Sequence, residues 1–212
     1  MLVSASILSE TLKPEVLIKK FNDTKVDYIH LDVMDGKFVT NKTFLLSEIK
    51  KFNDLSTKKL DVHLMVSNPK KYIEALALMN TLYITFHYEA VKNISELIEL
   101  VKSYGIKVGI SINPKTDVTS IFPYLKDIDM VLVMSVNPGK SGQTFIEGVK
   151  YKIEALNNEI KNNDYKTIIS VDGGVNKENS LTIKQLGANM LVTASFIQGD
   201  DMIQNINYLK EL

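Results

Sequence analysis

The chain has 212 residues, of which 45% are hydrophobic and 24% charged, so it can bury a core and lacks the composition of a disordered protein. Its 25 basic and 25 acidic residues balance, and the sequence contains no arginine, which excludes a strongly basic nucleic-acid-binding surface and arginine clamps for phosphate. The absence of cysteine excludes disulfides and thiolate metal sites.

Membrane and secretory signals are absent from the sequence. No apolar run is long enough for a membrane-spanning helix, and the first residues lack a basic stretch followed by a long apolar one. No linker-like or low-complexity tract divides the chain. We therefore expect a cytoplasmic protein with one catalytic domain over residues 1–212 and with neither nucleic-acid nor membrane partners.

Short apolar or β-branched runs alternate with amphipathic segments along the chain. The runs predict strands at residues 2–6, 28–32, 60–65, 82–87, 107–112, 130–134, 167–172 and 190–193. Amphipathic segments at 70–79, 93–104, 145–162 and 178–185 predict helices between them. This alternation is typical of a parallel sheet with right-handed crossovers.

Two of the predicted helices have recognisable start signals. Asn68 precedes Pro69, which combines a capping residue with a proline suited to the first helical position. Asn93 and Glu96 approximate a capping box, with asparagine in place of serine or threonine. Both pairs follow a predicted strand, so they mark turns from strand into helix.

Eight strand–helix units predict an α/β protein consisting of a single (β/α)8 TIM barrel, with the active site at the carboxyl ends of the strands. The alternative is a doubly wound open sheet. It is disfavoured because no Gly-x-Gly-x-x-Gly follows the first strand. In addition, ligand-type residues end the second, third and seventh strands, which a closed barrel readily brings together.

Three predicted strands end in side chains that are typical metal ligands. His30 and Asp32 share one face of their strand, and we expect His63 and Asp172 to face the same interior. Two imidazoles and two carboxylates suit one divalent ion such as zinc, iron(II), manganese or cobalt better than calcium or magnesium. Each residue alone also fits a structural role, as a core histidine or a turn-capping aspartate. Their coincidence favours a metal site, because buried carboxylates are costly without a partner.

The third histidine, His87, also ends a predicted strand. We expect it to support the site rather than to bind the metal.

Loops that follow the last three strands have features of phosphate-binding or mobile loops. Gly173 and Gly174 lead toward a helix that Asn176 is placed to cap, which predicts an anion cradle of backbone amides. Ala194 and Ser195 offer further amides after the eighth strand, where barrels often bind phosphate. The loop at 137–143 is long enough to act as a lid. Ordinary turns and a plain solvent loop are the alternatives.

Met34, Met65 and Met134 lie within or just after strand ends. They suggest a non-protic cap over a reacting carbon, with ordinary core filling as the alternative.

Taken in order, these motifs resemble the ribulose-phosphate 3-epimerases, a barrel family of the pentose phosphate and Calvin pathways. The similarity covers almost the whole chain, in ASILS at 5–9, HLDVMDGKFV at 30–39, DVHLMV at 61–66, MSVNPG at 134–139, GQ at 142–143 and VDGGV at 171–175.

The resemblance implies an isomerase of carbohydrate metabolism with a sugar phosphate as its substrate and a homo-oligomeric state. It implies that His30, Asp32, His63 and Asp172 bind the metal and that Asp32 and Asp172 are also the acid/base pair. With the three methionines, the expected substrate-binding residues are Ser6, Met34, His63, Met65, Met134, Gly139, Lys140, Ser141, Gly142, Gly173, Gly174, Ala194 and Ser195.

The expected reaction interconverts D-ribulose 5-phosphate and D-xylulose 5-phosphate through a metal-stabilised enediolate. One alternative is a 3-epimerase for a hexulose 6-phosphate such as D-allulose 6-phosphate, whose relatives resemble Asp-Gly-Ser-Cys where this chain has Gly174 and Val175. A barrel decarboxylase or aldolase is disfavoured because residues 61–65 lack the lysine of Asp-x-Lys-x-x-Asp. A non-catalytic sugar-phosphate-binding barrel is the remaining alternative.

The chain departs from the family pattern at Thr40, at Lys140 and Ser141, and at Ala194, where the family usually has proline, Phe-Gly and glycine. An added methyl group at Ala194 can crowd a phosphate or demand a different backbone angle. These departures bear on phosphate affinity and lid behaviour, because every expected metal ligand is present.

Overall fold

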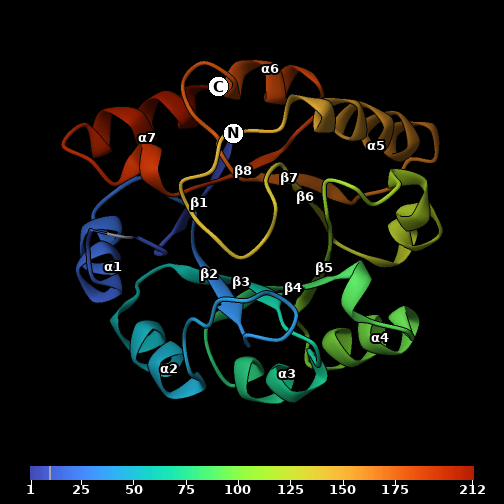
Figure 1. Ribbon diagram of the computed structural model, residues 1–212, viewed down its shortest axis with the longest axis horizontal. Helices are drawn as coiled ribbons and strands as arrows, with labels where there is room; N and C mark the ends of the chain where they lie inside the picture. Colours follow the sequence, from blue (N-terminus) through green and yellow to red (C-terminus); the bar gives the residue numbers. More distant parts are fainter. Residues whose placement is uncertain (10) are drawn as a thin grey trace.

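The computed structural model of the protein describes residues 1–9 and 11–212. Its parallel strands close into one barrel in sequential order, which confirms the (β/α)8 prediction and shows that the open-sheet alternative is wrong (Figure 1). The strands are β1 (Leu2–Ser6), β2 (Tyr28–Met34), β3 (Lys59–Met65), β4 (Thr81–His87), β5 (Lys107–Ile112), β6 (Met130–Met134), β7 (Ile168–Asp172) and β8 (Met190–Thr193).

Helices surround the barrel (Figure 1). The α-helices are α1 (Pro14–Asn22), α2 (Leu46–Leu55), α3 (Lys70–Ala77), α4 (Ile94–Ser103), α5 (Lys150–Asn162), α6 (Ser180–Gln185) and α7 (Met202–Glu211). The 3-10 helices are η1 (Tyr88–Ala90), η2 (Val118–Asp127), η3 (Glu147–Val149) and η4 (Ser195–Ile197). The segment between β5 and β6 is 3-10 rather than α-helical, and it contains Pro123, which lacks the amide hydrogen that an α-helix needs.

Of the two predicted helix starts, the one at α4 has its side-chain cap. Asn93 Oδ1 accepts from the Glu96 amide at 3.4 Å, and Asn93 Nδ2 donates to the Glu96 carboxylate at 3.1 Å. Before α3, Pro69 has helical backbone angles as expected, but it is the backbone carbonyl of Asn68 that accepts from the Lys71 amide. A proline at that position is tolerated because the first amides of a helix have no intrahelical acceptor.

Because side chains alternate between the two faces of a strand, the strands have an apolar outer face and a polar inner face near the carboxyl end of the barrel. On β2, Ile29, Leu31 and Val33 belong to the main core, which also contains Phe21 of α1 and Phe52 of α2. The residues between them therefore face the barrel interior. The β2–β3 register pairs His30 with Asp61 and Asp32 with His63, so imidazoles and carboxylates alternate across neighbouring strands.

The amino-terminal end of the barrel is closed by large side chains. Tyr83, Met130 and Met190 form a buried cluster near the starts of their strands, and the Tyr28 and Tyr83 rings meet edge to face at 5.8 Å. In the part of the chain that the structure describes, a pocket that reaches the interior lies at the carboxyl ends of the strands. Within the described part of the chain, no helix has both the length and the apolar character needed to cross a bilayer.

Candidate metal centre and active site

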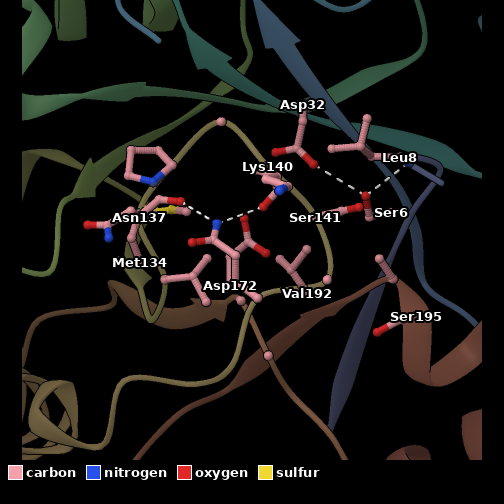
Figure 2. Close-up of a pocket in the computed structure, with 18 of the residues that line it drawn as sticks. Ser6, Leu8, Asp32, Met134, Asn137, Lys140, Ser141, Asp172, Val192 and Ser195 are labelled. Atoms are coloured by element: carbon pink, nitrogen blue, oxygen red, sulfur yellow. Dashed lines mark hydrogen bonds between the residues drawn. The ribbon is translucent and has the colours of Figure 1, made fainter. Parts of the chain in front are cut away.

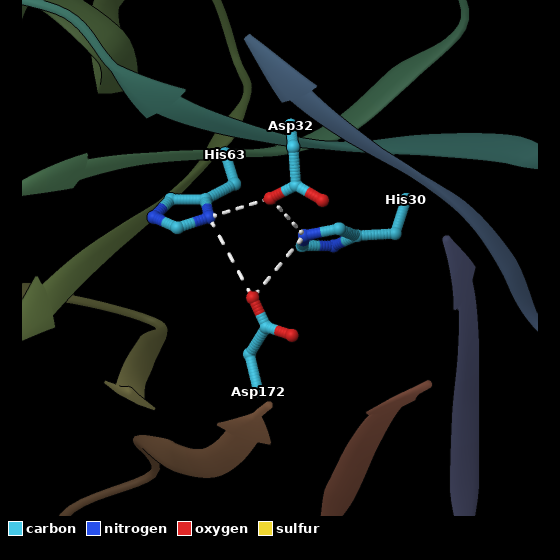
Figure 3. A group of neighbouring side chains, drawn as sticks. All are labelled: His30, Asp32, His63 and Asp172. Atoms are coloured by element: carbon cyan, nitrogen blue, oxygen red, sulfur yellow. Dashed lines mark hydrogen bonds and ion pairs between the residues drawn. The ribbon is translucent and has the colours of Figure 1, made fainter. Parts of the chain in front are cut away.

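Four predicted ligands meet at the carboxyl end of the barrel (Figure 3). His30 and Asp32 come from β2, His63 from β3 and Asp172 from the end of β7, and one ligand atom of each lies within 4.8 Å of the others. Asp32 Oδ1 is 3.0 Å from His63 Nδ1 and 3.3 Å from His30 Nε2. Asp172 Oδ2 is 3.8 Å and 3.9 Å from the same two nitrogens. Ligands about 2.1 Å from a tetrahedral ion lie about 3.4 Å apart, so this donor set fits a divalent transition metal.

The orientation of His30 supports a role as a ligand. Its Nδ1 donates to Asp61 Oδ2 at 2.8 Å, and the Ser4 hydroxyl donates to the same oxygen at 2.7 Å. Because an ionised carboxylate only accepts hydrogen bonds, the hydrogen of His30 lies on Nδ1 and Nε2 is left as the ligand atom. The sequence interpretation did not assign a role to Asp61, although its position opposite His30 in parallel strands is the signal that identifies it.

His63 directs Nδ1 toward the centre of the four side chains, whereas His30 directs Nε2. His63 Nε2 lies 2.9 Å from Nε2 of His87, and His87 Nδ1 lies 3.2 Å from Glu89 Oε2. His87 thus contacts a predicted ligand, and its supporting role stays a prediction. Glu89 was missed, and the His-x-Glu spacing at the end of β4 is the signal that points to it.

The two aspartates have opposite pKa shifts in the metal-free site. Burial alone would raise the pKa of Asp32, but the His30 and His63 imidazoles outweigh burial and hold that pKa far below its ordinary value. Burial and the nearby Asp32 carboxylate raise the pKa of Asp172 to about 7. One carboxylate is therefore ionised at neutral pH while the other can hold a proton.

The histidines also respond to their surroundings. Burial lowers the pKa of His30, yet Asp32 and Asp61 outweigh it and hold the pKa well above the usual value, so a bound cation has to displace a proton there. Burial lowers the pKa of His87 to about 4. Burial would raise the pKa of Glu89, but its hydrogen bonds, first of all the one with His87, hold it at about 2.

A pocket opens at the carboxyl ends of the strands, and two of the four predicted ligands, Asp32 and Asp172, line it (Figure 2). All the expected substrate-binding residues line it except His63, which is fully buried beneath it. Residues that were not among the expected substrate-binding residues also line it: Leu8, Val136, Asn137, Pro138, Gln143, Val175, Val192 and Thr193. Met34, Met65 and Met134 contribute to its wall and are almost entirely buried.

The glycines after β7 have backbone angles that favour glycine. Gly173 has φ +118° and Gly174 has φ +62°, and a Cβ at Gly174 would meet the backbone of Phe145 and, at 2.9 Å, the carbonyl of Gln143. Asn176 caps the turn that precedes α6, through bonds to the amides of Glu178 and Asn179, rather than the helix itself. The predicted anion cradle therefore consists of loop amides, without a helix terminus next to the glycines.

Ala194 does not require a left-handed backbone, because its φ is −117°. The loop at 137–143 folds on itself, since Gln143 Nε2 donates to the carbonyls of Asn137 and Lys140 at 2.7 Å and 2.8 Å. Asn41 Nδ2 donates to the Gly139 carbonyl at 2.8 Å, which ties this loop to the loop after β2. Its action as a lid stays a prediction.

Comparison with known proteins agrees with the resemblance noted in the sequence. The model of a family described as the ribulose-phosphate 3 epimerase family matches residues 2–198. A ribulose-phosphate 3-epimerase of Methanocaldococcus jannaschii is 41% identical over 213 residues, covering 99% of this chain and 89% of its own. One from Bacillus subtilis is 39% identical over 183 residues, covering 86% and 84%.

Among solved structures, a mutant tryptophan synthase α-subunit from Pyrococcus furiosus matches with a TM-score of 0.70. It is 14% identical in sequence, and the match covers 99% of this chain and 98% of that one. At this identity the similarity shows the barrel fold alone.

Proposed function

Since this chain belongs to the ribulose-phosphate 3-epimerase family, we propose that it interconverts D-ribulose 5-phosphate and D-xylulose 5-phosphate by proton transfer between carbon 3 and two carboxylates. Family membership makes the chain an enzyme, a pentose-phosphate epimerase of the isomerase class. The observation that carries the mechanism is the meeting of Asp32 and Asp172 beside two imidazoles at the base of the pocket.

Asp32 and Asp172 approach the pocket from opposite walls (Figure 2). The ionised carboxylate removes the proton from carbon 3 on one face of the sugar, and the protonated carboxyl group returns a proton to the other face. The C3–H bond that breaks is replaced by one of opposite configuration, and the two carboxyl groups exchange protonation states. Reaction in both directions requires that the two carboxyl groups share one proton, so they should titrate as a coupled unit.

Other residues of the pocket orient and shield the substrate. The Ser6 hydroxyl donates to Asp32 Oδ2 at 3.3 Å, which steadies the carboxylate. Met34, Met65 and Met134 offer no exchangeable proton and keep water away from carbon 3. Backbone amides of residues 173–174 and 194–195 are placed to bind the phosphate, and Lys140 brings a positive charge to the pocket.

His30, Asp32, His63 and Asp172 are the proposed ligands of one divalent ion, zinc, iron(II), manganese or cobalt. Bound there, such an ion supplies a Lewis acid for the substrate's ketone oxygen and offsets the negative charge that develops during proton transfer.

Asp172→Asn tests this assignment. Asparagine keeps the shape of the side chain but neither holds nor returns the proton, so turnover should fall by about 10²-fold to 10⁴-fold or more. Solvent deuterium should still enter carbon 3 of at most one of the two epimers, because Asp32 alone serves only one face of the sugar. Asp54→Asn, on the exposed surface of α2, is the matched control and should leave both readouts unchanged. Near-normal interconversion of the two epimers by Asp172→Asn would rule out its role.

The same assay addresses the substrate. Rates on D-ribulose 5-phosphate and D-allulose 6-phosphate, measured side by side, should favour the pentulose, because Gly174 and Val175 stand where hexulose-specific relatives have serine and cysteine. A faster rate on the hexulose would favour the alternative.

A further inference from the structure

A buried series of hydrogen-bonding groups leads from His63 away from the pocket. It passes from His63 Nε2 to His87 Nε2 at 2.9 Å and from His87 Nδ1 to Glu89 Oε2 at 3.2 Å. His63 and His87 are fully buried, and the Glu89 side chain is 23% exposed. The Phe38 ring packs on the His87 imidazole with 4.7 Å between ring centroids, which limits the movement of that ring.

Glu89, at the outer end of the series, is held in place by hydrogen bonds from the segment that follows β5. Glu89 Oε1 accepts from the Asn113 amide at 2.8 Å and from the Thr116 hydroxyl. The carbonyls of Asn113 and Thr116 in turn accept from the buried ammonium group of Lys152, at 2.8 Å and 2.5 Å. The glutamate is thus fixed between a histidine on one side and a backbone amide on the other.

The Glu89 carboxylate at the end of this series determines which atom donates in each hydrogen bond. A carboxylate only accepts, so the hydrogen between His87 and Glu89 belongs to His87 Nδ1. A neutral His87 then has a free lone pair on Nε2 and accepts the hydrogen of His63 Nε2. With its hydrogen on Nε2, His63 keeps the lone pair of Nδ1, the nitrogen that faces the four-ligand centre.

Asp32 favours the other tautomer of His63. Its Oδ1 lies 3.0 Å from His63 Nδ1, so in the metal-free site this carboxylate favours a hydrogen on the nitrogen that a cation needs. His87 Nε2, when held as an acceptor on the far side of the His63 imidazole, counteracts that preference.

We propose that His87 and Glu89 are positioning residues that hold the hydrogen of His63 on Nε2 and thereby present its Nδ1 lone pair to the divalent ion. The proposal rests on the metal site of the proposed function. It assigns a role in cation binding to two residues that have no contact with the substrate pocket.

Glu89→Gln gives the sharpest test, because the Asn113 amide dictates the orientation of the new side chain. That amide requires an acceptor, so the carbonyl oxygen of the introduced glutamine takes its place there and the glutamine amino group faces His87 Nδ1. In the metal-loaded protein, His87 then lies between two donors and can accept from only one of them. In the metal-free protein the His63 hydrogen can lie on Nδ1, beside Asp32. His63 Nε2 is then an acceptor, so His87 no longer lies between two donors.

The measurement is the affinity of the metal-free protein for Co²⁺, from titration against a competing chelator. We expect Glu89→Gln to lower the affinity by about 10- to 100-fold. Glu89→Ala should lower it less, because His87 is then free to take either tautomer. A purely structural role predicts the reverse order, since glutamine keeps the volume of glutamate and its bond to Asn113. Wild-type affinity in Glu89→Gln, or a greater loss in Glu89→Ala, would overturn the proposal.

Nitrogen-15 spectra of the Zn²⁺-loaded wild-type protein provide a second test that needs no variant, and only three histidines have to be assigned. The expected spectrum has hydrogens on His63 Nε2 and His87 Nδ1. A hydrogen on His87 Nε2 would overturn the positioning role even if Glu89→Gln did not fold.

Glu96→Gln on α4 is the matched control, because Glu96 is exposed and pairs with Lys70 at 2.8 Å. Its Co²⁺ affinity should equal that of the wild type. Failure of the wild-type protein to bind Co²⁺ would contradict the proposed metal site itself, whereas wild-type binding with unchanged variants would contradict only the positioning role.

Discussion

Asp32 and Asp172 show how surroundings differentiate identical side chains. Asp32 contacts both imidazoles, at 3.0 Å and 3.3 Å, whereas the nearest imidazole nitrogen to Asp172 is 3.8 Å away. Positive or hydrogen-bonding neighbours lower the pKa of a carboxyl group, and burial beside another carboxylate raises it. A pair with one ionised and one protonated member is suited to reversible epimerisation, because each direction needs both a base and an acid.

Gly174→Ala should impair substrate binding. Alanine at φ +62° is strained, and its Cβ would displace the backbone at Phe145 and Gln143. We expect KM for ribulose 5-phosphate to rise by about tenfold, the equivalent of one lost hydrogen bond to a charged group. Steady-state kinetics measures this change. Gly148→Ala is the control, because a Cβ there meets nothing within 4 Å, and equal KM values in the two variants would contradict the role of Gly174.

At the level of the elements, the loops that follow β2 and β3 are joined by one carboxylate. Asp35 accepts from the amide and hydroxyl of Ser67, at 2.8 Å and 2.7 Å, and from the amides of Lys37 and Phe38. Burial acts to raise the pKa of Asp35, but the hydrogen bonds from Ser67 and Phe38 outweigh it and hold that pKa well below its ordinary value. The loop that carries Val39 and Asn41 toward Gly139 is therefore held in place from its base.

Asp35→Asn should lower the free energy of unfolding by about 1–2 kcal/mol at neutral pH, because a neutral amide is a weaker acceptor. A lowered folded-state pKa stabilises the protein above the ordinary carboxyl pKa of about 4, and this stabilisation is lost as the pH falls below it. The difference between variant and wild type should therefore shrink between neutral pH and about pH 3 in urea unfolding. Asp54→Asn should stay within about 0.5 kcal/mol of wild type, and a pH-independent effect of Asp35→Asn would refute the explanation.

At the scale of the whole molecule, closure of the barrel brings β2, β3 and β7 around one point, although Asp32 and Asp172 are far apart in sequence. The buried carboxylates at that point repel each other, so a bound cation should stabilise the folded chain. The homo-oligomeric state expected from the family resemblance stays a prediction.

Removal of the metal by a chelator should abolish activity and lower the melting temperature. A ligand at about a thousand times its Kd stabilises the folded state by about 4 kcal/mol. For a chain of this size, each kcal/mol corresponds to about 2–4 °C, so we expect a decrease of about 8–16 °C in a thermal unfolding scan. Restoring a single divalent metal should recover both properties. Full activity after exhaustive chelation would contradict the proposed metal site.

The sequence determined the barrel fold and which side chains cluster at its carboxyl end. These depend on local patterns: alternation decides which side chains of a strand share a face, and parallel strands deliver their carboxyl ends to one edge. His30 and Asp32 lie in β2, His63 lies in β3 and Asp172 ends β7, and closure of the barrel brings these side chains together.

Only the tertiary structure decided which nitrogen of each histidine faces the centre and what lies behind it. His30 presents Nε2 and His63 presents Nδ1, because Asp61 lies behind the first and His87 behind the second. The contacts of Glu89 with Asn113 and of Lys152 with Thr116 likewise join segments far apart in the chain. Side-chain rotation and hydrogen-bond direction are set by such neighbours, and the spacing of residues along one strand carries no record of them.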